Sequence, residues 1–370
     1  MSRFRLLIIF SVLLADVIGT SVASACGGLF CQNVPVDQQA ERIIFTINDD
    51  STVSAYVQIN YTGEAAEFSW VVPVPSVPDV DVAEMSSFNE LSNLTAPIMI
   101  PPLMPSCAPV PLMAAGAVEE SVRSDGEVQV LASGTAGPYA FDVVTSENPD
   151  SLIIWLRDNS YRITEPMEPL VHVYSDEGMA FLAMKLQPDQ GAQDIQPIKM
   201  TYEAQQPTIP IRLTAVAANP NMTILTWIFA DAQTMTTNFA RPVIKDVDIR
   251  GDFFSFGGTN YLTLVDQTID LYEGRAFITE YAQPTSQLIR QGVQDDLVIE
   301  LTRNYDYVTR FFGRMSPEEM TVDPTFSIQA DLEPVSNIRD LSNVNPDVFW
   351  GCDNQPVELR FDPAVVPAGF

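Results

Sequence analysis

Residues 41–62 read ERIIFTINDDSTVSAYVQINYT, and they decide the fold class of this 370-residue chain. Two runs rich in β-branched and aromatic residues, 43–47 and 53–59, flank the sequence Asn-Asp-Asp at 48–50. Such residues favour strands, and Asn and Asp favour the tight turn that joins two antiparallel strands. The stretch therefore predicts a β-hairpin that ends before Gly63.

The next stretch, FSWVVPVPSVP at 68–78, predicts an extended segment at the edge of a sheet. Its three prolines, Pro73, Pro75 and Pro78, have no N–H group to donate to a neighbouring strand. A strand edge or polyproline-like segment of this kind is suited to binding another protein. We therefore take Trp70 and the three prolines as a candidate binding edge.

The rest of the chain mixes strand-like and helix-like patterns. Strands are predicted at 128–131, 140–144, 181–186, 198–202, 209–216 and 223–229. Short helices are predicted at 85–94, 148–159 and 261–272. The regular alternation of strand and helix that a parallel sheet requires is missing. The sequence therefore predicts a β-rich α+β fold with mostly antiparallel sheets and short scattered helices.

Length and composition predict more than one packed unit, because 370 residues, 46% of them hydrophobic, exceed what a single core usually holds. A Pro- and Met-rich run without periodicity, PIMIPPLMPSCAPVPLM at 97–113, indicates a boundary. The predicted segments are a signal peptide (1–25), an N-terminal β-rich unit with one short helix (26–96), a Pro/Met-rich connection (97–118), an α+β unit (119–330) and a C-terminal segment that returns to the core (331–370).

The first 25 residues have the pattern of a secretory signal peptide. Arg3 and Arg5 precede an apolar stretch at 6–14, and SVASA at 21–25 provides an A-x-A cleavage site. No later segment approaches 18 consecutive apolar residues, so we expect no transmembrane helix in the mature chain. Cleavage would release the chain into the periplasm or the medium. Acylation of Cys26, which would anchor a lipoprotein, is the alternative.

The chain is strongly acidic, with a formal net charge of −29. Such a surface repels nucleic acid and anionic lipid, so we expect no nucleic-acid partner. Either solubility or adaptation to a saline medium accounts for the acidity, or the acidic residues bind divalent cations. The weak candidates for calcium are Asp246 and Asp248 in DVDIRGD at 246–252. This stretch is not an EF-hand, because Gly257 stands at the twelfth position, where a bidentate Glu belongs.

The four cysteines, Cys26, Cys31, Cys107 and Cys352, are expected to form two disulfides, because export exposes them to an oxidising compartment. Four cysteines allow three pairings. We favour Cys26 with Cys31, because a Gly-containing turn brings them close, and the pair of Cys107 with Cys352 then follows. The spacing of the first pair is wider than CxxC, so a thioredoxin-type redox function is not indicated.

Motifs that identify a reaction are missing from the sequence. The single histidine, His172, occurs without HExxH spacing or a GxSxG elbow, so we predict a structural role for it. The sequence therefore favours a non-enzymatic binding or interaction module with an unknown protein or cell-surface partner and no cofactor besides the possible calcium. The alternative is an extracytoplasmic hydrolase that uses a pair of carboxylates, since sequence separation hides such a pair.

Seven stretches of the sequence resemble a bacterial exported family catalogued as domain of unknown function 2330. They are ACGGLFC (25–31), QQAERIIF (38–45), SWVVPVPSVP (69–78), WLRDNSY (155–161), IPIRLTAV (209–216), FITEYA (277–282) and RMSPEEMTVDPTF (314–326). The resemblance runs from about residue 25 to about residue 330. It implies export and supplies no reaction.

Overall fold

The structure is a computed structural model, and it describes residues 38–59, 68–105 and 129–352, except residues 162, 217, 253 and 254. In this part of the chain, fifteen strands and eight short helices form a strand-rich α+β fold with mostly antiparallel sheets. The predicted fold class is therefore confirmed. The predicted signal peptide and three of the four cysteines, Cys26, Cys31 and Cys107, lie outside the described residues.

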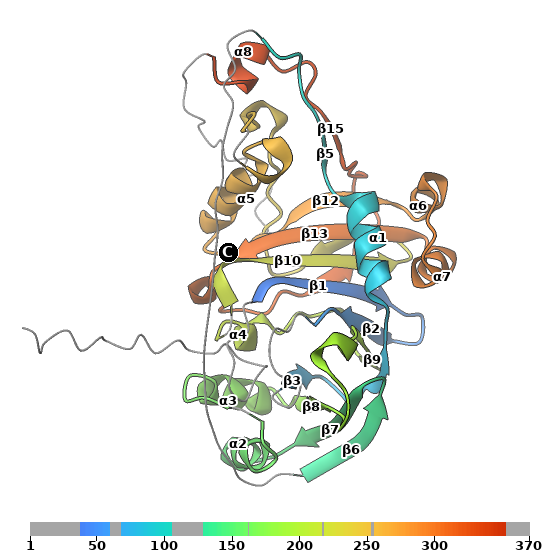
Figure 1. Cartoon of the computed structure of the whole chain (residues 1–370), viewed down its shortest axis with the longest axis vertical. Coiled ribbons are helices and arrows are strands. Elements are labelled where there is room, and N and C mark those ends of the chain that lie inside the picture. The colour runs from blue at the N-terminus through green and yellow to red at the C-terminus, as the bar shows by residue number, and fades with distance from the viewer. Residues whose placement is uncertain are drawn as a thin grey trace, which may run out of the picture.

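A seven-stranded sheet forms the middle of the molecule (Figure 1). Its strands, in spatial order, are β12 (Ile278–Pro284), β13 (Tyr307–Met315), β10 (Ala218–Ala230), β1 (Gln38–Ile47), β2 (Thr52–Val57), β9 (Ile198–Glu203) and β4 (Asp79–Val82). All neighbours are antiparallel except β1 and β10, which are parallel. Strands from both sides of the predicted connection at 97–118 belong to this one sheet. The connection therefore does not separate one sheet from another.

The predicted hairpin is confirmed by the antiparallel pairing of β1 with β2, in which Ile43 lies opposite Val57. Its turn is held by Asn48, whose backbone N–H donates to the carbonyl oxygen of Thr52 at 3.0 Å. The Asn48 side chain also donates from Nδ2 to the Thr52 hydroxyl at 2.8 Å. These bonds fix the strand register from within the turn, as short Asn-containing turns do.

A four-stranded antiparallel sheet lies below the central sheet in Figure 1. Its strands, in spatial order, are β3 (Ser69–Val74), β8 (Ala180–Leu186), β7 (Tyr139–Thr145) and β6 (Gln129–Ala136). Among the described strands, β3 pairs only with β8, so the stretch at 68–78 does lie at a sheet edge. Pro73 is inside β3, at a position where a central strand would need an N–H donor.

Short helices pack around the two sheets. The eight α-helices are α1 (Met85–Thr95), α2 (Pro149–Asp158), α3 (Glu168–Asp176), α4 (Ile211–Thr214), α5 (Tyr261–Asp270), α6 (Ser286–Gln291), α7 (Asp296–Asn304) and α8 (Pro346–Phe349). The described residues also form four 3-10 turns, which are η2 (Ala192–Asp194), η3 (Asp246–Asp248), η4 (Phe256–Gly258) and η5 (Pro317–Glu319). Contacts join α2 to α3, α1 to α7 and α5 to β13. No helix of the described residues has the length and apolarity of a membrane span.

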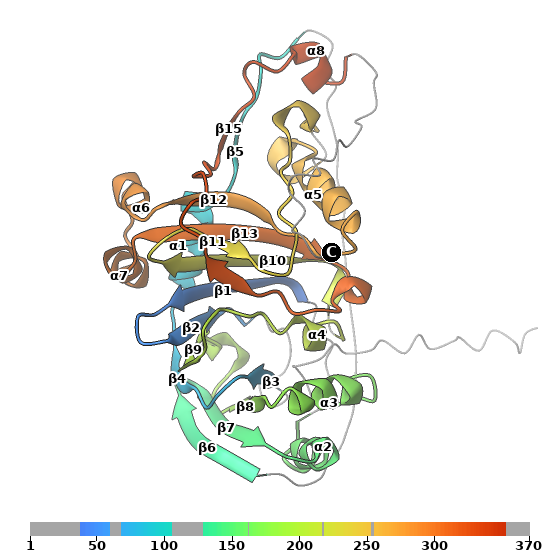
Figure 2. The same cartoon turned by 180° about the vertical axis from the view of Figure 1, so that it is seen from behind.

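A narrow ribbon extends from the central sheet toward α8, as Figures 1 and 2 show from opposite sides. It consists of β5 (Ile98–Ile100) and β15 (Ile338–Asp340), which pair in parallel. Beyond it, the Trp350 indole N–H donates to the carbonyl oxygen of Pro102 at 3.3 Å. A Cβ at Gly251 would lie only 2.7 Å from Trp350 Cε3, so this glycine permits the indole to pack against the backbone. The chain after β14 (Phe326–Ile328), which pairs with β11 (Thr234–Thr236), thus packs against earlier parts of the molecule.

The strand predicted at 209–216 is wrong, because this stretch contains the short helix α4. Pro210 directly precedes the helix and has no N–H for a strand ladder. At the first turn, the backbone N–H of Arg212 donates to Asp323 Oδ1 at 3.1 Å. An acceptor from a distant carboxylate therefore satisfies a helix N-terminal donor, which local sequence patterns do not reveal.

A buried ion pair connects two neighbouring strands, β12 and β13, at one edge of the central sheet. Arg310 Nε of β13 lies 2.8 Å from Glu280 Oε2 of β12, and both side chains are almost inaccessible to water. Tyr261 of α5 donates its hydroxyl to the other oxygen of Glu280 at 2.8 Å. Arg310 also donates to the hydroxyl of Thr95 at the end of α1. Two helices and two strands therefore meet at charges that are paired and hydrogen-bonded.

We predict that Glu280→Gln destabilises the fold by about 3 to 5 kcal/mol, because it leaves the buried Arg310 charge uncompensated. A matched control is Asp246→Asn, which breaks the ion pair that Asp246 forms with Arg339 at 2.7 Å. The side chain of Asp246 is half exposed. That change should cost less than about 1 kcal/mol. Denaturant unfolding of both variants measures the difference, and equal losses would contradict this account of the buried pair.

Candidate functional site

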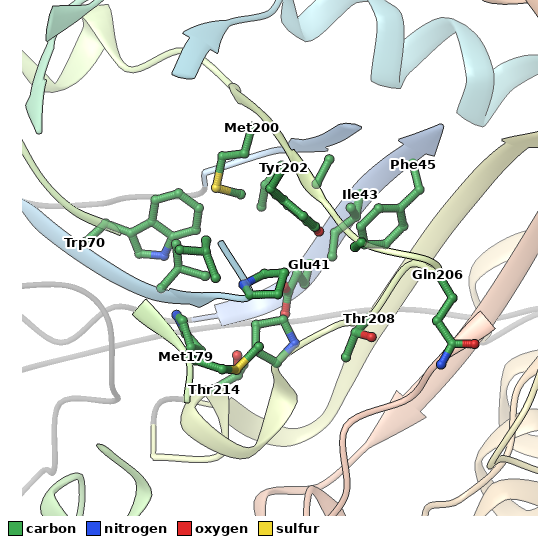
Figure 3. Close-up of a pocket in the computed structure, with 18 of the residues that line it drawn as sticks. Glu41, Ile43, Phe45, Trp70, Met179, Met200, Tyr202, Gln206, Thr208 and Thr214 are labelled. Atoms are coloured by element: carbon green, nitrogen blue, oxygen red, sulfur yellow. The ribbon is translucent and has the colours of Figure 1, made fainter. Parts of the chain in front are cut away.

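The candidate functional site is a pocket between the two large sheets. Alternate residues of a strand share one face, so Glu41, Ile43 and Phe45 project from β1 on the same side. The other strands that line the pocket contribute Ala55 and Val57 from β2, Met200 and Tyr202 from β9, and Trp70, Val72 and Val74 from β3. Figure 3 shows Trp70 and Met200 on one side, Phe45 on the other, and Glu41 between them.

The pocket is small and mostly apolar. Its volume is about 120 Å³, and its lining includes Pro75 and Gln206, which are exposed and mark its mouth. One water needs roughly 10 to 15 Å³ when volume is measured in this way, so the pocket has room for a small ligand. Its polar lining side chains are Glu41, Gln58, Tyr202, Gln206, Thr208 and Thr214. Apolar walls with a few polar groups are typical of small-molecule sites.

Glu41 is the unusual residue of this pocket. Its Oε2 atom is inaccessible to water and has no hydrogen-bond partner among the residues that the structure describes. Burial, and to a smaller extent the negative charge of Asp323, raises the pKa of the Glu41 carboxyl to about 7. A buried polar atom without a partner costs about 1 to 3 kcal/mol, so such atoms are rare in folded proteins. Strongly perturbed carboxyls in pockets are frequent at functional sites.

Asp323, the nearby carboxylate, is in contrast fully engaged. Arg212 of α4 donates to Asp323 Oδ2 from Nε at 2.9 Å and from a terminal nitrogen at 2.7 Å. Tyr174 of α3 donates its hydroxyl to Oδ1 at 2.9 Å. Arg212 also forms two bonds with the carboxylate of Glu177, at 2.8 and 2.6 Å. Four of the five side-chain N–H groups of Arg212 thus bind Asp323 and Glu177, and Arg212 forms no hydrogen bond with Glu41.

Part of the predicted binding edge lines the pocket. Trp70 and Pro73 are buried, and both line the pocket together with the exposed Pro75. Pro78 is buried and does not belong to the lining. Two of the four candidate residues, Trp70 and Pro73, therefore line the pocket from β3, and Pro75 lines it from the segment directly after this strand.

The predicted calcium ligands lie in the 3-10 turn η3 and do not line the pocket. Asp246 Oδ1 pairs with Arg339 at 2.7 Å, and Asp248 lies on the same 3-10 turn. Across residues 38–59, 68–105 and 129–352, no group of three or more His, Cys, Asp or Glu side chains is arranged to hold a metal ion. Calcium binding through Asp246 and Asp248 stays a prediction.

His172 and Cys352 occupy other parts of the surface. His172 lies in α3, where its Nε2 is 3.0 Å from Asp150 Oδ1 of α2, and both side chains are substantially exposed. It does not reach the pocket. Cys352 is the one cysteine among the described residues, so its proposed pairing with Cys107 stays a prediction.

Sequence reasoning missed Glu41, although a signal was present. Glu41 is in phase with Ile43 and Phe45 in the period of two that marks one face of a strand. A charged residue at such a core-facing position is unexpected. The pattern was hidden because Ile44, on the opposite face, is also fully buried, so the alternation of polar and apolar residues is weak.

A protein-family model described as "Uncharacterized protein conserved in bacteria (DUF2330)" matches residues 20–327. The chain belongs to this family. The match covers both large sheets and all the described residues that line the pocket. No curated protein and no solved structure matches this DUF2330 chain.

We predict that Glu41 makes the stability of the DUF2330 chain depend on pH. The folded-state pKa of about 7 lies above the ordinary value of 4.5, so the folded protein binds a proton that the unfolded chain has released. The stabilising contribution of protonated Glu41 is complete below about pH 4.5 and is lost as the pH rises through about 7. Relative to Glu41→Gln, the wild type should lose on the order of 3 kcal/mol across this interval.

Urea unfolding at a series of pH values measures this difference. The control is Glu203→Gln, which changes an exposed glutamate at the end of β9. It should leave the pH dependence as it is in the wild type. Parallel curves for the wild type and Glu41→Gln would show that Glu41 is not held in a perturbed state.

Proposed function

We propose that this chain is a non-enzymatic binding protein that holds a small ligand in the pocket around Glu41. The observation that carries the proposal is the unpartnered Oε2 of Glu41, which lies in an otherwise mostly apolar pocket between two sheets. A ligand that bonds to this oxygen would remove the cost of leaving it unsatisfied. Rigid strands on both sides hold the pocket in shape, which lowers the entropy cost of binding.

The alternative, a hydrolase with a pair of carboxylates, needs two such groups on opposite sides of the scissile bond. Among the described residues that line the pocket, Glu41 is the single carboxyl. Asp323 does not line it, and Arg212 and Tyr174 already occupy its oxygens. This arrangement supports binding over hydrolysis.

We also propose that the chain acts outside the cytoplasm, as the signal-like sequence at 1–25 indicates. Its ligand would then come from the periplasm, the cell surface or the medium. The pattern Ala23-Ser24-Ala25 before Cys26 supports cleavage and release, and lipid anchoring through Cys26 is the alternative.

The pocket itself can be tested by filling it. Ala55 is buried in β2 and lines the pocket, so Ala55→Leu places three additional carbon atoms in the space. We expect at least one of benzylamine, benzyl alcohol and benzoate to bind the wild type in saturation-transfer NMR, and Ala55→Leu to abolish that signal.

The control for this experiment is Ala330→Leu, an equal change at an exposed turn, which should bind as the wild type does. Circular dichroism checks that Ala55→Leu is folded. Binding that persists undiminished in folded Ala55→Leu, or no binding of the three probes to the wild type, would contradict the proposal.

The proposed pairing of Cys107 with Cys352 has support from nearby contacts. Pro102 accepts a hydrogen bond from Trp350, so the chain shortly before Cys107 lies close to the chain shortly before Cys352. Non-reducing peptide mapping should find these two cysteines joined, and a peptide that joins Cys31 to Cys107 would show the pairing to be wrong. Because the bridge closes a long loop, Cys352→Ser should lower the free energy of unfolding by up to about 5 kcal/mol.

A further inference from the structure

The charge balance of the pocket indicates what kind of ligand it accepts. Among its described lining residues, Glu41 is the one ionisable acid, and none of them is Lys, Arg or His. The guanidinium of Arg212, which binds the nearby Asp323, is also paired with Glu177. An ionised Glu41 therefore has no counter-charge among the described residues that line the pocket. A positively charged ligand would provide this counter-charge.

The surroundings of Glu41 disfavour a negatively charged ligand. The described titratable and charged groups around it are Tyr202 from β9, Arg212 from α4, Tyr174 and Glu177 from α3, Asp323 before β14, and Arg42 from β1. Arg42 lies next in sequence, so its side chain leaves the opposite face of β1, where it bonds to Asn89 and Ser92 of α1. Burial keeps the pKa of Tyr202 well above its usual range, so this phenol is neutral. The formal net charge of −29 adds a general attraction for cations.

The walls of the pocket suit a cation with an apolar body. Trp70, Tyr202 and Phe45 provide aromatic rings, and Figure 3 shows them around the central Glu41. Aromatic faces attract cations, and Trp does so most strongly. Met179 and Met200 add thioethers that adapt to the shape of an apolar group. The volume of about 120 Å³ is below that of an engineered cavity of about 150 Å³ that holds benzene, so a ligand with one ring and an amine would extend into the open mouth of the pocket at Pro75 and Gln206.

We propose that the ligand of this pocket is a small organic cation, a protonated amine whose apolar body is no larger than about one aromatic ring. Its ammonium group donates to the Glu41 carboxylate, and its body lies against Trp70 and the two methionines. This inference rests on the proposed function, because it names the class of ligand for the same pocket.

The ionisation of Glu41 gives the inference a measurable consequence. An amine binds the carboxylate form, which is scarce well below pH 7 and predominant above it. The apparent dissociation constant equals the intrinsic one divided by the fraction of competent protein. Between about pH 5.5 and about pH 8, the affinity for benzylamine should therefore rise about 30-fold, since benzylamine stays protonated throughout. A neutral ligand that accepts a bond from protonated Glu41 would show the opposite trend.

The experiment is a titration of the full chain with benzylamine and with benzyl alcohol at both pH values, by calorimetry or ligand-observed NMR. The two probes share their aromatic body and differ in charge. We expect benzylamine to bind more tightly than benzyl alcohol at the higher pH. Glu41→Gln should remove this preference and the pH dependence, whereas Glu203→Gln, at an exposed position, should retain both.

The outcomes separate the two proposals. If benzyl alcohol or benzoate binds in the wild type and fails to bind in Ala55→Leu, but benzylamine has no advantage, the binding function stands and the cationic ligand is overturned. Benzylamine affinity that falls with rising pH overturns it as well. If none of the probes binds, both proposals fail. Should Glu41→Gln not fold, the pH dependence of the wild type and the loss of binding in Ala55→Leu decide the question.

Discussion

The parallel pairing of β1 with β10 is the constraint on which the rest of the molecule depends. It places the N-terminal hairpin in the centre of a sheet whose other half comes from residues beyond 217. Its register aligns Glu41 with Ile224 and Arg42 with Leu225. Because side chains alternate across a strand, a shift of one residue would exchange the two faces of β1. Arg42 would then enter the pocket, and Glu41 would face α1. The register therefore decides which charge the pocket contains.

Two glutamates with carboxyl oxygens inaccessible to water differ in their partners, and the difference shows how much stability the pocket gives up. Glu280 is as inaccessible as a core residue, yet Arg310 and Tyr261 satisfy both of its oxygens. Glu41 lies in the same fold and has an unpartnered oxygen and a raised pKa. The fold can thus supply partners to a buried carboxyl where structure alone requires it. A position that departs from this rule is where a functional constraint is expected, because evolution retains such a cost only for a compensating gain.

Much of the fold could be predicted from the sequence because its signals are local. The hairpin depends on a turn centred on Asn48, and α2 begins at an Asn148 cap followed by Pro149. The segment 209–216 could not be predicted, since its helix is completed by Asp323, more than a hundred residues away. The pocket could not be predicted for the same reason. It exists only where β3 approaches three strands of another sheet, and a sequence pattern does not specify which sheets face each other.

Pro73 in β3 and Pro75 directly after it also affect how the sheet edge meets the pocket. At an edge strand they withhold N–H groups, and this prevents a further strand from pairing there. Pro73 and Pro75 lie where the pocket meets that edge, and Pro75 is exposed at its mouth. A strand added at this position would extend the four-stranded sheet past β3. The same residues that suggested a surface for docking another chain therefore disfavour a further strand at this edge, and they also line the pocket that contains Glu41.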